Sequence, residues 1–224
     1  MTEHTALLII DMQKENGLPL ERLPQVVDNA STLIAAARSQ GIPLFYTRHV
    51  NDALGRDMAP GEPADTQGRP LSYQAGSASV EILDALAPHP DDCVIDKQRY
   101  SAFHGTRLAA LLRSRGIRRL VVLGMLTDVC VMTSLFDAYQ HDFELVLVAD
   151  ACTATTLAAH YSSLLILSNW VYGLEIFSTQ QLIKHWRGEP AQSLRTSEPD
   201  HLAYQPQAFV EAIHSFERRL AREC

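Results

Sequence analysis

Cysteine is scarce in this sequence, and the cysteines that it has are far apart. Cys93, Cys130, Cys152 and Cys224 are spread over 224 residues, and no two of them form a CxxC pair. Dense cysteine spacing marks disulfide-rich secreted domains and structural zinc sites. The nine histidines also show no recognisable metal-ligand spacing. The sequence therefore predicts reduced thiols, no metal site and no other cofactor.

Long apolar runs and an excess of positive charge are also missing. The N-terminal stretch MTEHTALLIIDMQ has a short apolar run with no basic region before it, which is typical of a buried strand and not of a signal peptide. The apolar residues 157–174 include a histidine, serines and an asparagine, too polar a mixture for a membrane span. The formal net charge is -7, whereas nucleic acids and anionic membranes require clustered Lys and Arg. We expect a cytoplasmic protein that binds neither.

The composition that is present is that of a globular protein, with strands and helices in alternation. Hydrophobic residues make up 46% and charged residues 20% of the chain. Alternating β and α segments predict right-handed crossovers and an open, mostly parallel sheet with helices on both faces, a three-layer α/β/α fold. The expected strands, which are short apolar runs, are 6–10, 43–47, 93–96, 119–124 and 144–150, and the expected helices are 23–39, 78–86, 106–115 and 129–141.

Two segments depart from this alternation. Residues 51–78 are rich in Gly, Pro and Asp and lack periodicity, which predicts a lid or an oligomer-contact loop. After Trp186 the sequence becomes polar, and a helical pattern then resumes at about 206–222 with an apolar stripe that must pack on its own domain or on a neighbouring subunit. We therefore expect a domain at 1–187 and a C-terminal extension at 188–224. The stripe consists of Phe209, Ile213, Phe216 and Leu220.

Three residues with reactive side chains follow expected strands. Asp11 and Lys97 come directly after two of them, and Cys130 lies at a strand-to-helix junction just past a third. Ligands of open parallel sheets bind at this edge. A thiol attacks a carbonyl as thiolate, and a helix N-terminus beside a cation depresses the thiol pKa, so Cys130 is a candidate nucleophile. Asp11 would take the thiol proton and deliver it to a leaving amine, and Lys97 would orient Asp11.

Each of these three residues also fits a commoner structural role. A cysteine after a strand is most often a small buried hydrophobic residue. Asp11 would serve equally well as a helix N-cap, and Lys97 as a solvated loop charge. Their joint occurrence at one edge of the sheet favours the catalytic interpretation.

Three segments of the chain resemble the isochorismatase-like hydrolases, also called the cysteine hydrolase superfamily. They are ALLIIDMQ around Asp11, DKQRYSAFHGTRLAALLRSRGIRRLVVLG with Lys97, and GMLTDVCVMTSLFDAYQHDFELVLVADA around Cys130. The resemblance implies that the matching Asp, Lys and Cys form the catalytic triad of a three-layer α/β fold. It also implies a covalent thioester-type intermediate, with ammonia or an amine released before water attacks.

The resemblance has a further implication for the backbone before the nucleophile. It implies a cis peptide bond just upstream of Cys130, which by position joins Met125 and Leu126. A cis bond between non-proline residues is costly, so it would be retained to direct a backbone N–H at the oxyanion. The amides of Leu126 and Cys130 would then form the oxyanion hole.

Within the family, KQRYSAFHGTRL resembles the ureidoacrylate, biuret and N-carbamoyl amidohydrolases. Their substrates are small ureido compounds or amides, often with a carboxylate. Arg99 or Arg48 would pair with such an anion through a bidentate fork, and Tyr100, Phe103 and Trp170 would supply apolar walls. Each of these residues fits a packing or surface role equally well. The expected partner is a small amide or ureide, and both the family and the tail helix predict a homo-oligomer.

Three other functions remain open at this point. Nicotinamidases carry an Asp-x-His metal pattern after the second strand, where this chain has His49 and Asn51, although His49 and Asp52 remain alternative ligands. Isochorismatase-type vinyl-ether hydrolases lack the nucleophilic cysteine, so Cys130 argues against that chemistry. A catalytically silent binding module would keep the fold without turnover.

Overall fold

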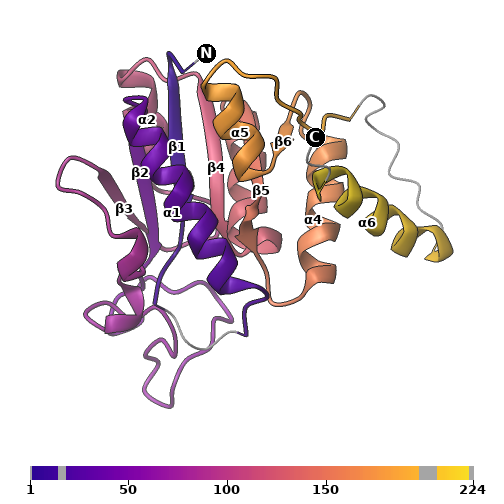
Figure 1. The fold of residues 1–224 in the computed structure, drawn as a ribbon. Helices are drawn as coiled ribbons and strands as arrows, with labels where there is room; N and C mark the ends of the chain where they lie inside the picture. Colours follow the sequence, from indigo (N-terminus) through magenta and orange to yellow (C-terminus); the bar gives the residue numbers. More distant parts are fainter. Residues whose placement is uncertain (1, 15–18, 197–205, 222–224) are drawn as a thin grey trace.

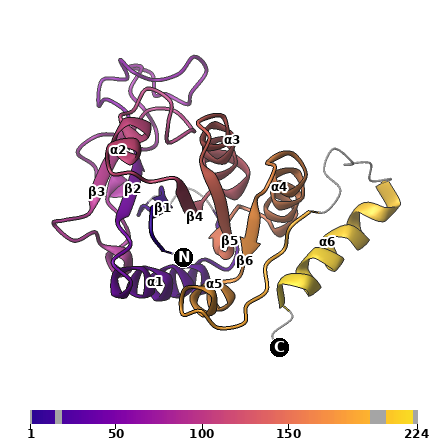
Figure 2. The same ribbon diagram turned by 90° about the horizontal axis from the view of Figure 1, so that it is seen from above.

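The computed structural model describes residues 2–14, 19–196 and 206–221 and shows a parallel six-stranded sheet between two layers of helices (Figure 1). The strand order is β3-β2-β1-β4-β5-β6. Figure 2 shows α1 and α5 on one face of the sheet and α2, α3 and α4 on the other. The predicted three-layer α/β/α fold is thereby confirmed. The strands are β1 (Thr5–Ile10), β2 (Leu44–His49), β3 (Cys93–Lys97), β4 (Arg119–Met125), β5 (Glu144–Thr153) and β6 (Glu175–Phe177).

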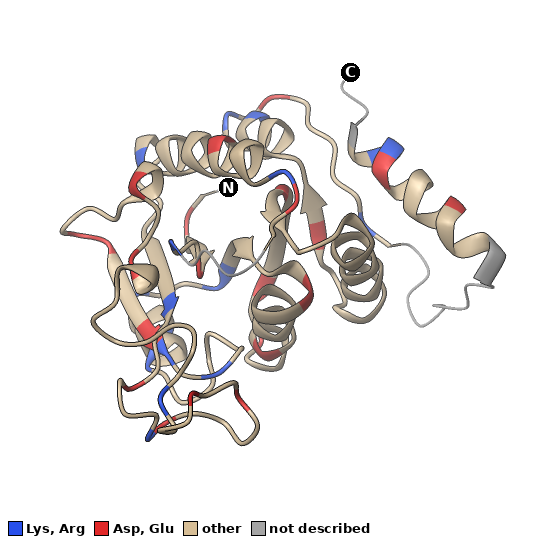
Figure 3. Cartoon of the chain, turned by 90° about the horizontal axis from the view of Figure 1, so that it is seen from below, with Lys and Arg blue, Asp and Glu red and all other residues tan. Residues whose placement is uncertain are grey.

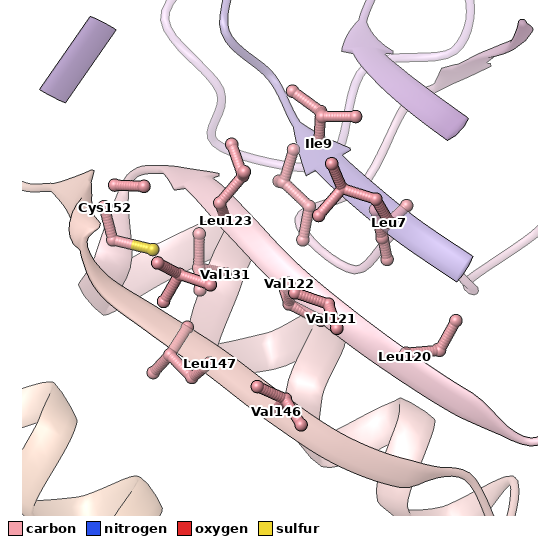
Figure 4. Packing of buried hydrophobic residues seen from close by; sticks show 14 of the residues in the cluster. Leu7, Ile9, Leu120, Val121, Val122, Leu123, Val131, Val146, Leu147 and Cys152 are labelled. Carbon is pink, nitrogen blue, oxygen red and sulfur yellow. The ribbon is translucent and has the colours of Figure 1, made fainter. Parts of the chain in front are cut away.

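The core lies on both faces of the central strands. All six residues of β1 are buried, and so are six of the seven residues of β4. Figure 4 shows side chains of β1, β4 and β5 packed together, among them Leu7, Val122 and Leu147. Strands that are covered by helices on both sides must be apolar at every position, which explains the continuous runs in the sequence.

The helices agree with the sequence in part. They are α1 (Leu23–Ser39), α2 (Leu108–Ser114), α3 (Met132–Gln140), α4 (Leu157–Trp170), α5 (Thr179–Trp186) and α6 (Pro206–Ala221). The helix expected at 106–115 is shorter, and the one expected at 129–141 begins as a π turn, Thr127–Val131, before α3. The strand β6 and the helices α4 and α5 were not predicted as such. The three residues of β6 are too few for a periodic signal, and the apolar residues of α4 are spread around the helix and do not form one face.

The prediction of a helix at 78–86 is wrong. The structure has two short 3₁₀ turns there, Ala78–Val80 and Asp84–Leu86, and Glu81 between them is extended. The amide of Leu83 donates to the carbonyl of Met12 over 2.9 Å, and Gln13 pairs with Ile82. Tertiary hydrogen bonds to the chain just after β1 therefore replace the bonds that a continuous helix would have made.

A glycine allows β4 to approach β1 closely. Gly124 has a φ of 131°, and a Cβ atom at this position would lie 2.1 Å from the carbonyl oxygen of Ile10. The pairing of β4 with β5 shifts register between Val122 and Gly124. Only glycine fits this combination of dihedral angle and contact. Gly124 therefore lets the end of β4, which leads into the π turn with Cys130, lie close against β1.

The C-terminal segment returns to the body of the molecule. Leu194 exchanges both backbone hydrogen bonds with Ile176 of β6. Helix α6 then lies beside α4, with Phe216 buried, and Tyr161 of α4 donates to Glu217 over 3.1 Å (Figures 1 and 2). The apolar stripe thus packs on its own chain. A search of the described ranges finds no helix that is both long and apolar enough to cross a membrane.

Candidate active site

Asp11, Lys97 and Cys130 meet at the carboxyl edge of the sheet. The Nζ of Lys97 lies 2.6 Å from Oδ2 of Asp11 and 3.5 Å from Sγ of Cys130. Lys97 is fully buried, and Asp11 and Cys130 are 6% and 9% exposed. A lysine with no exposed surface requires partners for its charge, and here it has a carboxylate and a sulfur. The structure therefore brings together the three residues that the sequence singled out.

The strand order explains why these residues converge. Asp11 follows β1, Lys97 ends β3, and the π turn with Cys130 follows β4. In the sheet, β1 lies between β2 and β4, and β3 lies next to β2, so the ends of these strands are close together. The backbone of Asp11 has a φ of 49°, a left-handed conformation that Asp tolerates better than most residues. Its amide bonds to the carbonyl of Thr47, and the hydroxyl of Thr47 donates to Oδ1 over 2.7 Å. Strand β2 thus orients the carboxylate from the side.

The electrostatics of the triad centre on Lys97. Burial opposes the charge of this ammonium group, but the neighbouring Asp11 and Cys130 outweigh burial and hold the pKa of Lys97 above its ordinary value. Its Nζ also donates to the backbone carbonyl of Arg99 over 2.9 Å. Lys97 therefore stays positively charged at neutral pH.

The expected depression of the Cys130 pKa is wrong for the free protein. Burial raises the pKa of the Cys130 thiol, and the Asp11 carboxylate raises it further. Lys97 lowers it, but by less than these two effects together. The thiol is therefore protonated in the resting site. The sequence argument counted the helix terminus and the nearby cation and missed the desolvation.

The backbone before Cys130 has the geometry that the resemblance implied. The peptide bond between Met125 and Leu126 is cis. Leu126 is the N-cap of the π turn, and its carbonyl accepts from the amides of Val129 and Val131, both at 3.1 Å. Cys130 lies within this turn. The π turn is also held from α4, because Oγ1 of Thr127 lies 2.8 Å from Nδ1 of His160.

A cavity of about 340 Å³ opens above Asp11 and Cys130. The loop between β2 and the 3₁₀ turns closes one side of it, and the residues that follow β4 close the other. Figure 3 looks onto this edge and shows acidic and basic residues interspersed over the loops. Apolar side chains supply most of the wall: Leu20, Met58, Pro63, Met125, Leu126 and Val129. Polar and aromatic side chains supply the rest: His49, Asn51, Glu62, Ser72, Tyr73 and Tyr100.

The expected substrate contacts divide into one inside and four outside the cavity lining. Tyr100 is part of the lining. Arg48 forms an ion pair with Asp96, with Nε 2.8 Å from the carboxylate. Arg99 directs its guanidinium to the backbone carbonyl of Asp57 over 2.8 Å. The expectation that one of these two arginines faces the substrate therefore finds no support in the cavity.

Phe103 and Trp170 also lie outside the lining. Phe103 is buried, with its ring 6.0 Å from that of Phe143, so it belongs to the core. Trp170 ends α4 and is 42% exposed. Apolar walls are present, but they come from Met, Leu and Val side chains that carried no signal in the sequence beyond hydrophobicity.

Sequence reasoning missed the polar wall of the cavity. His49 ends β2, Asn51 follows two residues later, and Glu62 comes from the 51–78 loop. His49 and Asn51 are 5% and 4% exposed. The signal that was available is the position of TRHVND at the end of a strand adjacent to β1, where side chains reach the same sheet edge.

One trio in the described residues has the spacing of metal ligands. The ligand atoms of Asp11, His49 and Cys130 all lie within 4.8 Å of one another. The ammonium group of Lys97, however, already contacts both Asp11 and Cys130 and supplies the positive charge there. Asp52, the alternative ligand, is paired with Arg56 and does not line the cavity. The donor set fits a lysine-compensated thiol site better than a cation site.

Comparisons with known proteins show which family model and which relatives the chain matches. The model of the isochorismatase domain matches residues 5–181. The ureidoacrylate amidohydrolase RutB of Enterobacter sp. (strain 638) is 32% identical over 174 residues, covering 66% of this chain and 75% of the relative. An isochorismatase family protein from Desulfovibrio vulgaris superposes with a TM-score of 0.74 at 29% identity, covering 82% of this chain and 98% of that one. A cysteine hydrolase from Pseudomonas syringae pv. phaseolicola shares the fold, with a TM-score of 0.73 at 24% identity over 84% of this chain and 94% of that one.

Proposed function

This chain belongs to the isochorismatase family, and from that premise we propose that it is a cysteine-dependent hydrolase of a C–N bond in a small amide or ureido substrate. The observation that carries the proposal is the buried contact of Lys97 with both Asp11 and Cys130. A carboxylate, an ammonium group and a thiol enclosed at the floor of a small cavity are the parts needed for nucleophilic catalysis. The relatives named as ureidoacrylate amidohydrolases support a ureido or amide substrate.

The first half of the reaction forms an acyl-enzyme. The carbonyl carbon of the substrate lies against Sγ of Cys130, and Asp11 takes the thiol proton as the S–C bond forms. The amides of Leu126 and Cys130 are the proposed donors to the oxyanion. The C–N bond then breaks, and Asp11 returns the proton to the departing nitrogen, so that ammonia or an amine leaves.

The second half hydrolyses the thioester. Asp11 takes a proton from the attacking water, the C–S bond breaks, and the thiolate regains the proton. Lys97 keeps its charge throughout, because it neutralises whichever of Asp11 and Cys130 is negative. Its role is to stabilise the anion and to hold the other two side chains in place.

The decisive experiment replaces the thiol. Cys130→Ala should lower ammonia release from amides and ureides by at least about a thousandfold, as for other nucleophile deletions, with an unchanged circular dichroism spectrum. Cys152→Ala is the matched control, because Cys152 is also buried but does not line the cavity. Mass spectrometry of Cys130→Ser after incubation with a substrate should show an acyl adduct on this residue. Full turnover by Cys130→Ala would refute the proposal.

A further inference from the structure

The lining of the active-site cavity contains carboxylates but no cation among the described residues. Asp11 and Glu62 belong to the lining, and no Lys or Arg does. Lys97 lies beneath the cavity floor without exposed surface and is already paired with Asp11. In the segments that the structure does not describe, Arg222 is the only Lys or Arg of the sequence. A carboxylate on the substrate would therefore lie near the Glu62 carboxylate without a cation of the described lining to neutralise it.

The two arginines that the sequence indicated as substrate contacts are occupied by other groups. Arg48 bonds to Asp96 with Nε and the terminal nitrogen at 2.8 and 3.0 Å, a bidentate pair. Arg99 is held by backbone carbonyls, including that of Asp57. Turning either side chain into the cavity would break these bonds, and an arginine fork is worth most when both of its contacts are kept.

The polar wall presents hydrogen-bond acceptors to a ligand, the amide oxygen of Asn51 and the carboxylate of Glu62. Oδ1 of Asn51 and Nε2 of His49 are buried, and neither has a hydrogen-bond partner of good geometry in the described part of the chain. The amide nitrogen of Asn51 donates to a carboxylate oxygen of Glu62 over 3.4 Å, and both residues line the cavity. An amide oxygen and a carboxylate can only accept. Since a buried acceptor without a partner is costly, this wall favours a ligand that donates.

His49 does not supply the missing positive charge. Burial lowers the pKa of His49, and the nearby Lys97 lowers it further, against the opposing effects of Asp11, Glu62 and a weak polar contact with Asn51. The neutral ring stacks near Tyr73, with ring centroids 4.8 Å apart. His49 therefore presents a neutral ring nitrogen to the cavity and no cation for an anionic substrate.

We propose that the substrates of this site are neutral or positively charged amides or ureides, whose end remote from the scissile bond donates hydrogen bonds to Asn51 and Glu62. Anionic ureido acids are disfavoured by the Glu62 carboxylate. The inference rests on the proposed function for the chemistry at Cys130. It separates this chain from a ureidoacrylate specificity, because ureidoacrylate is an anion.

The test compares three ureas of similar length that differ in charge: ureidoacetate, N-(2-hydroxyethyl)urea and N-(2-aminoethyl)urea. Binding is measured by calorimetry on full-length Cys130→Ala, which cannot turn the ligands over. We expect ureidoacetate to bind at least about tenfold more weakly than N-(2-aminoethyl)urea, a modest effect for one unit charge near another in a partly buried site. When Glu62→Gln is added to Cys130→Ala, the affinities for ureidoacetate and N-(2-aminoethyl)urea should differ by no more than about threefold, because the carboxylate that separates them is gone.

The matched control makes the same change outside the cavity. Glu81→Gln also removes one carboxylate from a neighbouring segment, but Glu81 faces Arg48 and does not line the cavity, so the ratio should stay as it was. Equal or tighter binding of ureidoacetate, binding of none of the three ureas, or an equal effect of Glu81→Gln would overturn the inference.

Ammonia release by the unmodified protein separates this inference from the proposed function. The expected order of binding without any ammonia release would overturn the proposed function and leave the substrate class standing. Ammonia release that favours ureidoacetate would overturn the substrate class and leave the cysteine hydrolase standing.

Discussion

The charge state of Cys130 depends on its burial and on the charges of Asp11 and Lys97. Burial and the Asp11 carboxylate raise the pKa of the thiol, and Lys97 lowers it by less. The resting site therefore holds a protonated thiol near a carboxylate. In the proposed reaction, the proton moves to Asp11 when the substrate carbonyl lies against Sγ of Cys130. Such a site avoids a permanently reactive thiolate while keeping the base in contact with the nucleophile.

Asp11→Asn separates the two roles of the carboxylate. Removing its negative charge lowers the pKa of Cys130, so alkylation of Cys130 by iodoacetamide at pH 8 should become faster. Ammonia release should fall by at least about a hundredfold, because the proton acceptor is lost. Alkylation is followed by peptide mass spectrometry and turnover by an ammonia assay.

Asp96→Asn is the control for a change of one charge near the site. Asp96 is exposed, adjoins Lys97 in the chain and pairs with Arg48, its neighbour on β2. Asp96→Asn should leave the rates of Cys130 alkylation and of ammonia release close to those of the unmodified protein. Slower alkylation of Cys130 in Asp11→Asn would contradict the expected effect of the Asp11 charge on the reactivity of the thiol.

At the scale of elements, the proposed nucleophile, Cys130, lies in a π turn that contacts both its own flanking elements and α4. The turn Thr127–Val131 continues β4 into α3, and α4 contacts it through His160 and Thr127. His160 is 8% exposed. Burial lowers the pKa of His160 to about 4, with a smaller contribution from Arg22. At neutral pH, the link between α4 and the π turn is therefore made by a neutral histidine.

This link should make the fold sensitive to mild acid. The folded pKa of His160 is about 4, below the ordinary histidine value of 6.5, so the unfolded chain binds the proton first as the pH falls. The stability that depends on neutral His160 is complete above pH 6.5 and is lost as the pH falls through about 4, a loss of about 3 kcal/mol. Urea unfolding at several pH values between 7 and 4 measures this change.

His160→Gln keeps a polar side chain without the titration. The variant should lose much less stability than the unmodified protein over the same pH interval, whatever its stability at pH 7. His89→Gln, which alters an exposed histidine, should retain the original pH dependence. An unchanged acid sensitivity in His160→Gln would assign the effect to another group.

At the scale of the whole molecule, the tail is attached to the body but contributes nothing to the described active site. No residue after Cys130 lines the active-site cavity within the described ranges. We propose that residues 1–187 form the hydrolase domain and 188–224 an extension, of which Leu194 pairs with β6 and α6 packs on α4. The homo-oligomer and the cytoplasmic location stay predictions.

A chain that ends after Thr196 should therefore keep its activity and lose stability. Ammonia release should remain within about threefold of the full chain, because no transition-state contact is removed. The free energy of unfolding should fall by roughly 2 kcal/mol, the order of one buried aromatic side chain, because the contacts of Phe216 and Glu217 with the body are lost. Urea unfolding and circular dichroism measure the change.

Two substitutions in the full chain check the origin of that loss. Phe216→Ala removes the buried contact of α6 and should destabilise by a similar amount, whereas Val210→Ala alters an exposed residue of the same helix and should cost less than about 0.5 kcal/mol. Abolished turnover in the truncated chain would show that the extension belongs to the catalytic unit.

The sequence by itself determined the layers of the fold and the three residues that meet at the carboxyl edge of the sheet. Strands covered on both faces must be apolar throughout, so β1, β4 and β5 could be recognised from local composition. Asp11, Lys97 and Cys130 could be found because the ends of parallel strands share one edge, whatever their separation along the chain. The bounds of α1 were also predictable from its amphipathic pattern.

Only the tertiary structure decided the chemistry of the surroundings. Whether Arg48 and Arg99 face a substrate depends on which distant groups bind them, and Asp96 and a backbone carbonyl do so. The pKa of Cys130 depends on its burial, which no local pattern reports. The replacement of a helix at 78–86 by two 3₁₀ turns depends on bonds to the chain after β1. Solvent exposure and long-range pairing are properties of the assembled chain, because they are set by neighbours that the sequence places far away.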